Sequence, residues 1–182
     1  LESVMGILAA FFPNLCSRVE LPNRSIQGRP IYALWMRAGG GGARRGVLLV
    51  GGMHARELMN PDAIVELMLD LALSYLNETG RSYGGASWSA LDVKIMLETL
   101  DIWILPCANP DGREFVMQQV GGDRMWRQNR RDNPGTPCDG VDLNRNSDFV
   151  WGVTGPATSC NPCSSTRSYL GPTPFSEPES KN

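Results

Sequence analysis

The sequence has 182 residues, 42% of them hydrophobic, so it is long enough for one compact domain and too apolar to be wholly disordered. Its 17 basic and 19 acidic residues give a net charge of −2, and its only lysines are Lys94 and Lys181, so a nucleic-acid-binding protein is a poor fit. No stretch approaches the roughly 18 apolar residues that a membrane-spanning helix needs, and we expect no membrane partner.

The predicted elements, in chain order, are a helix over residues 1–12, strands over 17–21, 30–37 and 46–50, helices over 60–77 and 90–98, and a strand over 100–106. Asn60 and Pro61 favour a helix start. Polar residues at every fourth position leave the rest of that helix apolar, which predicts that it is mostly buried.

The strands over 30–37 and 46–50 can pair as a hairpin across the glycine loop between them. The almost continuous apolar run of 100–106 predicts a strand that is buried on both faces. Residues 109–112 predict a turn, and beyond Gly121 we expect mostly loops. Strands interleaved with helices indicate an α/β fold with a mixed β-sheet flanked by helices. His54 and residues 109–112 directly follow strands, where such sheets bind ligands.

His54 is the only histidine, and Glu57 lies three residues after it. Imidazole nitrogen and carboxylate oxygen are both good zinc ligands. Taken alone, the pair is a weak signal, and a surface histidine with a glutamate that the helix dipole favours at a helix start explains it better.

Four arginines cluster in the last third of the chain, namely Arg127, Arg130, Arg131 and Arg145. Guanidinium groups suit a carboxylate or a developing oxyanion. The alternative is a solvated face with local salt bridges, because several aspartates are interleaved with these arginines.

The chain has five cysteines, so at least one thiol is unpaired within a monomer. Cys160 and Cys163 form a Cys-x-x-Cys motif, which occurs in redox sites and in structural zinc sites. A disulfide between Cys138 and one of these two cysteines is at least as plausible.

Six motifs then occur in a characteristic order: GRPIYAL, GGMHARE, ILPCANPDG, WRQNRR, GVDLNRN and PCSS with YLGPTPFSEPE. In this order they resemble the zinc metallocarboxypeptidases, and the HARE and FSEPE segments favour the carboxypeptidase A/B-like branch. The resemblance implies a carboxypeptidase-like three-layer sandwich. Residues 1–182 would be the N-terminal portion of its catalytic domain, incomplete at the C-terminus.

The resemblance implies that one Zn²⁺ is bound and that His54 and Glu57 are its first two ligands. It implies that Asp142 orients the imidazole of His54, an arrangement common around metal-bound histidine. Arg127 would stabilise the oxyanion of the tetrahedral intermediate.

On the substrate side, the resemblance implies that Asn144 and Arg145 bind the terminal carboxylate of a peptide or protein and that Arg56 contacts the peptide. It pairs Cys138 with Cys163 in a disulfide. The cysteines without an assigned partner are Cys16, Cys107 and Cys160. The chain departs from many relatives at Ser147 and Asn129, neither of which has an assigned role.

The third zinc ligand of the family is a histidine downstream of FSEPE, and this chain has no second histidine. The family's capping tyrosine and general-base glutamate would also lie beyond Asn182. We therefore expect that the chain is part of a zinc metallocarboxypeptidase and that it is inactive on its own. The alternative is a non-catalytic module that binds peptide C-termini or a partner protein, and a third possibility is cleavage of peptidoglycan-type peptides.

The resemblance and the disulfide predict an extracellular, secreted protein.

Overall fold

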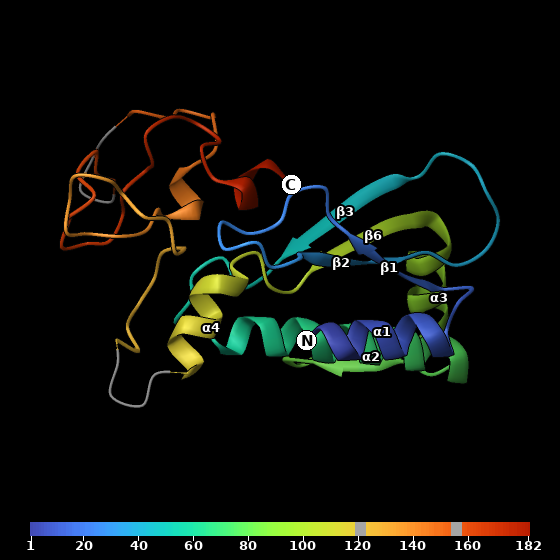
Figure 1. Ribbon diagram of the computed structural model, residues 1–182. Coiled ribbons are helices and arrows are strands. Elements are labelled where there is room, and N and C mark those ends of the chain that lie inside the picture. Colours follow the sequence, from blue (N-terminus) through green and yellow to red (C-terminus); the bar gives the residue numbers. More distant parts are fainter. Residues whose placement is uncertain (119–122, 154–157) are drawn as a thin grey trace. The chain divides into compact units, whose positions relative to one another are not determined.

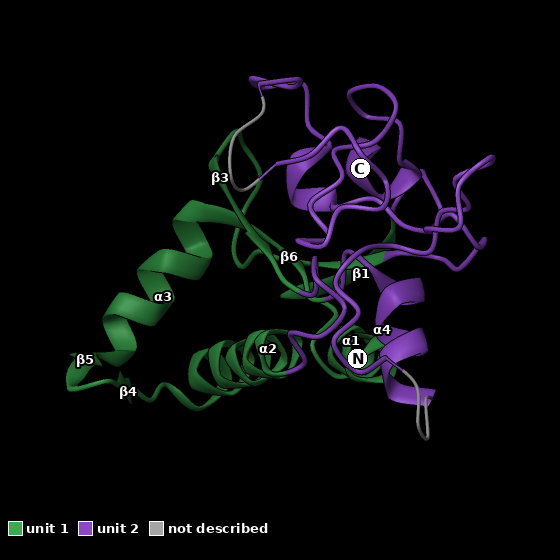
Figure 2. Ribbon diagram, turned by 90° about the vertical axis from the view of Figure 1, so that its left-hand side faces the viewer, with its two compact units in different colours: residues 1–20, 32–51, 59–106 green, residues 21–31, 52–58, 107–182 purple. Residues whose placement is uncertain are grey.

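The computed structural model describes residues 1–118, 123–153 and 158–182 (Figure 1). The chain forms two compact units, which are drawn in different colours in Figure 2. Unit 1 consists of Leu1–Glu20, Tyr32–Gly51 and Met59–Pro106, and unit 2 of Leu21–Ile31, Gly52–Leu58 and Cys107–Asn182.

Unit 1 contains three helices and six strands: α1 (Glu2–Phe11), β1 (Cys16–Glu20), β2 (Tyr32–Met36), β3 (Arg45–Val50), α2 (Met59–Asn77), β4 (Arg81–Tyr83), β5 (Ala86–Trp88), α3 (Ala90–Thr99) and β6 (Leu100–Leu105). Every helix and strand predicted from the sequence is present within a few residues of its expected bounds. The mixed sheet and its flanking helices confirm the α/β class.

The four-stranded sheet has the order β1-β2-β6-β3. Strand β6 lies between the two strands that were expected to form a hairpin, pairing antiparallel with β2 and parallel with β3. The predicted hairpin is therefore wrong. The apolar strand β6 makes hydrogen bonds on both sides in this central position, which an edge position would not allow. Among the described residues β3 lies at the end of the sheet, and Leu48 on it is 65% exposed.

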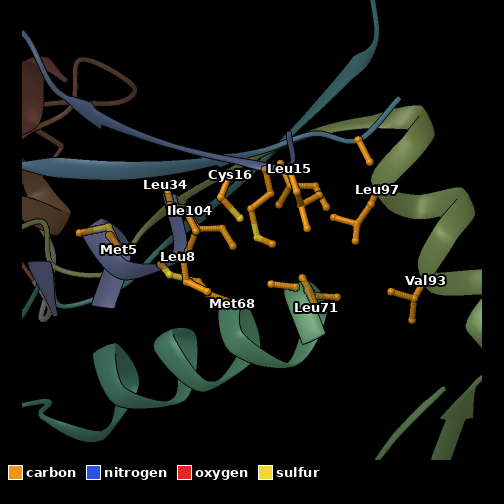
Figure 3. Close-up of a cluster of buried hydrophobic side chains, with 14 residues drawn as sticks. Met5, Leu8, Leu15, Cys16, Leu34, Met68, Leu71, Val93, Leu97 and Ile104 are labelled. Carbon is orange, nitrogen blue, oxygen red and sulfur yellow. The ribbon is translucent and has the colours of Figure 1, made fainter. Parts of the chain in front are cut away.

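The core of unit 1 fills the space between the sheet and the helices (Figure 3). Helices α1 and α2 run along one face of the sheet (Figure 1). The core residues labelled in Figure 3 are Met5, Leu8, Leu15, Cys16, Leu34, Met68, Leu71, Val93, Leu97 and Ile104. Helix α2 exposes Leu73 and Leu76, so the prediction that it is mostly buried is wrong. Only one stripe of α2 packs on the core.

A short hairpin of β4 and β5 was not predicted. Its turn uses Gly84 and Gly85, both with positive φ, which suits the tight turns of two-stranded hairpins. The strands have three residues each, too few for alternation of polar and apolar residues to be recognised in the sequence.

The described part of unit 2 contains α4 (Pro110–Gln118) and two 3₁₀ helices, η1 (Leu143–Arg145) and η2 (Pro178–Lys181). The turn predicted over residues 109–112 is the start of α4. The side-chain oxygen of Asn109 accepts a hydrogen bond from the backbone N–H of Gly112 at 2.9 Å and so caps the helix, with Pro110 at its first position. The rest of the described part of unit 2 is mostly loop, as expected.

Candidate metal and substrate site

His54 lies in the short segment Gly52–Leu58 of unit 2, which directly follows β3 in the chain. Two contacts within unit 2 hold this segment. The backbone N–H of Ala55 donates to the carbonyl of Arg127 at 3.0 Å, and the side-chain amide of Asn109 donates to the carbonyl of Met53 at 3.2 Å. The side chain of His54 is only 9% exposed, so neighbouring groups fix its position from several sides.

Both ring nitrogens of His54 face carboxylates. Nε2 lies 3.1 Å from Oδ1 of Asp142, and Nδ1 lies 2.9 Å from Oε1 of Glu57. Asp142 is fully buried, whereas the side chain of Glu57 is half exposed. A histidine that donates from Nε2 to the buried carboxylate directs its Nδ1 lone pair to the position that Oε1 of Glu57 also faces. A proton or a cation at that position would be bound by both groups.

Arg127 contacts the same buried carboxylate. Its Nε and Nη2 each lie 3.1 Å from Oδ2 of Asp142, and its Nη1 lies 3.8 Å from Oε1 of Glu57. Burial alone raises the pKa of Asp142, but the hydrogen bond to His54 and the charge of Arg127 outweigh it, so the pKa lies below its usual value. Asp142 is therefore an anion that holds an imidazole and a guanidinium in fixed positions.

Asn144 and Arg145 belong to η1, and Asp142 is the N-cap of that helix. Oδ1 of Asp142 accepts the backbone N–H of Asn144 at 3.1 Å. Nη1 of Arg145 donates to the carbonyl of Asn144 at 2.8 Å. The same aspartate thus links the His54 side of the cluster to the turn that presents Asn144 and Arg145. The guanidinium of Arg56 reaches the carbonyl of Met125 at 3.3 Å.

The other two arginines of the predicted cluster have structural contacts. The guanidinium carbon of Arg130 lies 3.9 Å from the ring centroid of Phe115 and 4.5 Å from that of Trp126, where cation–π attraction is effective. Arg131 donates to Glu177 at 2.8 Å. Local pairing thus explains these two arginines, while Arg127 contacts the histidine cluster through Asp142.

The structure has a disulfide between Cys138 and Cys163, the pairing that the resemblance implies. Cys160, the other half of the Cys-x-x-Cys motif, is an exposed free thiol. Cys107 is a half-buried thiol, and burial raises the pKa of Cys16, in the core of unit 1, to about 12.

Sequence reasoning gave no role to a second group of polar side chains that is as buried as Asp142. Its members are Asn129, Asn146 and Glu177, none of which has exposed surface. Asn129 lies in WRQNRR and Glu177 in FSEPE, two motifs already singled out. The sequence offered no further signal, because a buried polar residue cannot be told from an exposed one by its type.

The fold and the site define an α/β protein with a cluster of histidine, carboxylates and arginine. The sequence matches the family described as zinc carboxypeptidase over residues 1–182. Carboxypeptidase A2 of Mus musculus is 38% identical over 178 residues, which are 98% of this chain and 37% of that protein. Carboxypeptidase A4 of Mus musculus is 34% identical over 180 residues, 98% of this chain and 38% of that protein.

The crystal structure of carboxypeptidase A from Helicoverpa armigera is similar with a TM-score of 0.77 and 31% identity, over 99% of this chain and 39% of that one. The chain therefore belongs to the zinc carboxypeptidase family. It spans only 37% to 39% of the length of these three relatives.

The family implies a zinc ion, and the donor types at His54 and Glu57 suit one. Nδ1 of His54 and Oε1 of Glu57 lie 2.9 Å apart, so both can face the same ion. Among residues 1–118, 123–153 and 158–182, no group of three or more His, Cys, Asp and Glu side chains is arranged to hold a metal. The described helices include none with the length and apolar character needed to cross a membrane.

Proposed function

We propose that residues 1–182 are part of the catalytic domain of a zinc-dependent carboxypeptidase that hydrolyses the C-terminal peptide bond of peptides or proteins. The observation that supports this most directly is the contact chain from Glu57 through His54 and Asp142 to Arg127. It joins two zinc-type donors, a carboxylate that orients one of them, and a cation.

His54 and Glu57 would hold the ion, and a bound Zn²⁺ polarises a carbonyl and makes water acidic. A catalytic zinc normally has three protein ligands, so the third would come from outside these 182 residues. Asp142 keeps the imidazole oriented by accepting its Nε2 proton. Arg127, held by Asp142, would present Nη1 to the oxygen of the scissile carbonyl, which becomes negative in the transition state.

The terminal carboxylate of the substrate would bind to Arg145 by a charge-assisted contact and to the amide of Asn144. Both residues lie in η1, and its N-cap is the same Asp142. Arg56 would contact the peptide chain. A single buried anion would thus set the spacing between the group that recognises the end of the substrate and the group that acts on its carbonyl.

A second candidate is a non-catalytic module that binds peptide C-termini or a partner protein. It is favoured by the single histidine of this sequence, because two ligands hold zinc weakly. For the same reason we propose that the 182-residue chain alone, supplied with zinc, does not turn over a peptide substrate.

The test compares the full-length protein and the 182-residue chain, each with zinc, on a peptide with a free C-terminus and on its C-terminal amide. Hydrolysis of the free acid by the full-length protein, lost on His54→Ala, would support the carboxypeptidase. Binding of the free acid without hydrolysis by the full-length protein would support the module. Turnover by the 182-residue chain, abolished by His54→Ala, would show that the chain needs no further ligand.

The compartment is part of the same proposal. A disulfide between Cys138 and Cys163 persists in oxidising surroundings and is rare in the cytosol. We therefore propose an extracellular, secreted protein, to be tested by recovering the full-length protein from the medium of the cells that make it.

A further inference from the structure

Two segments of unit 2 run side by side next to the candidate site. The backbone N–H of Asn129 donates to the carbonyl of Val141 at 3.0 Å, and that of Gly140 donates to the carbonyl of Arg131 at 2.7 Å. Arg127 lies two residues before Asn129, and Asp142 directly follows Val141. The spacing of the two segments therefore sets how the guanidinium of Arg127 meets the carboxylate of Asp142.

Gly140 permits this close approach. Its φ is +92°, and a Cβ atom there would lie 2.7 Å from Cβ of Gln128 and 2.9 Å from the carbonyl oxygen of Asn129. Any larger residue would push the segments apart, because real Cβ atoms essentially never come so close to their neighbours.

The side chain of Asn129 adds a contact to each side. Its Oδ1 accepts the backbone N–H of Val141 at 2.8 Å, and its Nδ2 donates to Oε2 of Glu177 at 2.7 Å. Asn129 and Glu177 have no exposed surface. A change at either residue would therefore leave an unsatisfied polar group where water cannot replace the lost partner.

Glu177 is itself held from three directions. Its Oε1 accepts hydrogen bonds from Nη1 of Arg131 and from the hydroxyl of Ser176, both at 2.8 Å. Its backbone N–H donates to Oδ1 of Asn146 at 3.0 Å. The carboxylate is thus a fixed point to which Asn129 attaches the Arg127 and Asp142 segments.

We propose that Asn129 and Glu177 are positioning residues for the reaction: their buried hydrogen bond fixes Arg127 relative to Asp142 without contacting the substrate. This inference rests on the proposed function for its catalytic consequence. Its structural part, the pairing of the two segments, stands independently of that function.

The pair offers a reciprocal exchange. Asn129→Asp places a carboxylate against the carboxylate of Glu177, and Glu177→Gln places an amide N–H₂ against that of Asn129 or against Arg131. Combined, the two changes reverse the bond: Nε2 of Gln donates to the new Asp, and Oε1 of Gln still accepts from Arg131 and Ser176. Glu179, whose Oε2 lies 3.4 Å from Nδ2 of Asn129, faces the new Asp in the single and the double variant alike, so the comparison of these two variants isolates the effect of Glu177. Each single variant should break the link, and the double variant should restore it.

The first measurement does not depend on activity. We expect hydrogen–deuterium exchange at the Val141 amide of the 182-residue chain to be at least tenfold faster in each single variant than in wild type, and to return towards the wild-type rate in the double variant. Single variants that keep wild-type protection at Val141, or a double variant that stays as unprotected as the singles, would overturn the proposal.

The second measurement uses the full-length protein with zinc. Because a misplacement of about 1 Å can cost about 10²-fold in rate, we expect each single variant to lower kcat by tenfold or more and to change KM by less than threefold. The double variant should recover most of kcat. Loss of kcat without recovery in a double variant that has regained Val141 protection would contradict a positioning role.

Asn133 provides the matched control, since it is a buried asparagine of the same region that donates to the carbonyls of Cys138 and Gly140 instead of to Glu177. Asn133→Asp can lower stability, but adding Glu177→Gln should rescue neither its exchange rate nor its kcat. If a single variant does not fold, Glu177→Asp replaces it, because it keeps the charge and withdraws the carboxylate from Asn129. If the variants show the expected exchange pattern but the full-length wild-type protein hydrolyses no peptide, the proposed function is refuted and the pairing of the two segments still stands.

Discussion

Nε2 of His54 lies 3.1 Å from Oδ1 of the buried Asp142, a contact between residues 88 positions apart in the sequence. It determines which ring nitrogen is available on the opposite side, where Oε1 of Glu57 lies 2.9 Å from Nδ1. The orientation of the imidazole is thus set by a carboxylate that would not itself touch the metal.

Asp142→Asn should lower the zinc affinity of the full-length protein by about 10- to 100-fold, the usual cost of removing such an orienting carboxylate. The amide can still accept from Nε2, but it loses the charge that favours a polarised imidazole and holds Arg127. The affinity is measured by competition with a chelator. Asp139→Asn, which removes a carboxylate paired with Arg130 at 3.5 Å, is the control and should not change the affinity. Equal affinities in the two variants would contradict this assignment of Asp142.

The sequence predicted the local elements of unit 1 because their hydrophobic patterns and caps are local. The order β1-β2-β6-β3 was not predicted: it depends on whether β3 pairs with its neighbour in sequence or with the distant β6, and Leu100–Leu105 is apolar enough for either arrangement. The β4–β5 hairpin was too short for its pattern to be recognised.

At the site, the resemblance named the residues that the structure places in contact, namely His54, Glu57, Arg127 and Asp142. It did not reveal Asn129 or Glu177, whose importance lies in burial and reciprocal hydrogen bonds. In a segment as charged as WRQNRRD, solvent exposure is the ordinary expectation for every residue, and only three-dimensional packing shows that Gln128 and Asn129 are buried whereas Asp132 is exposed.

The stability of the chain should depend on Glu179. Burial raises the pKa of this carboxyl to about 6, a change that the charge of Glu177 supports and that the N–H of Ile26 partly offsets. Between pH 4.5 and 6 the folded chain keeps a proton that the unfolded chain has released, so this group's contribution to the free energy of unfolding falls as the pH rises.

Glu179→Gln removes that dependence and still offers an oxygen to the N–H of Ile26. At pH 7 we expect the variant to be more stable than wild type by about 1–2 kcal/mol, and at pH 4 the difference should vanish. Urea unfolding of both chains across this range measures it. Glu78→Gln, at an exposed position, is the control. A difference that grows as the pH falls would have the wrong sign for this explanation.

The Cys138–Cys163 disulfide joins two residues of unit 2 that are 25 positions apart in the sequence. Because cross-linking a loop of this size restricts the unfolded chain, replacing both cysteines by serine should lower the free energy of unfolding by about 3 kcal/mol. Cys160→Ser, which changes only an exposed free thiol, should have little effect. Peptide mapping of the oxidised chain gives a direct check, and a bond between Cys138 and Cys160 would contradict the structure.

Arg145 and Arg127 should differ in their kinetic effects in the full-length protein. If Arg145 binds the terminal carboxylate, Arg145→Ala weakens the binding of substrate and transition state together. KM should then rise, and kcat/KM should fall by a factor equivalent to about 2–5 kcal/mol of transition-state stabilisation. If Arg127 acts on the oxyanion, Arg127→Ala lowers kcat by about 10²–10³ with a smaller change in KM. Because Arg127 also pairs with the buried Asp142, Arg127→Lys, which keeps the charge, separates a loss of stability from a loss of oxyanion contact.

The amidated substrate distinguishes the two roles. An amide has no terminal charge for Arg145 to bind, so Arg145→Ala should cost little on the amide and much on the free acid, and the preference for a free C-terminus should largely disappear. Arg127→Ala should slow both substrates by a similar factor, because the oxyanion forms in either case. Steady-state kinetics on the matched pair of peptides measures both effects. An Arg145→Ala protein that still prefers the free acid as strongly as wild type would show that another group binds the carboxylate.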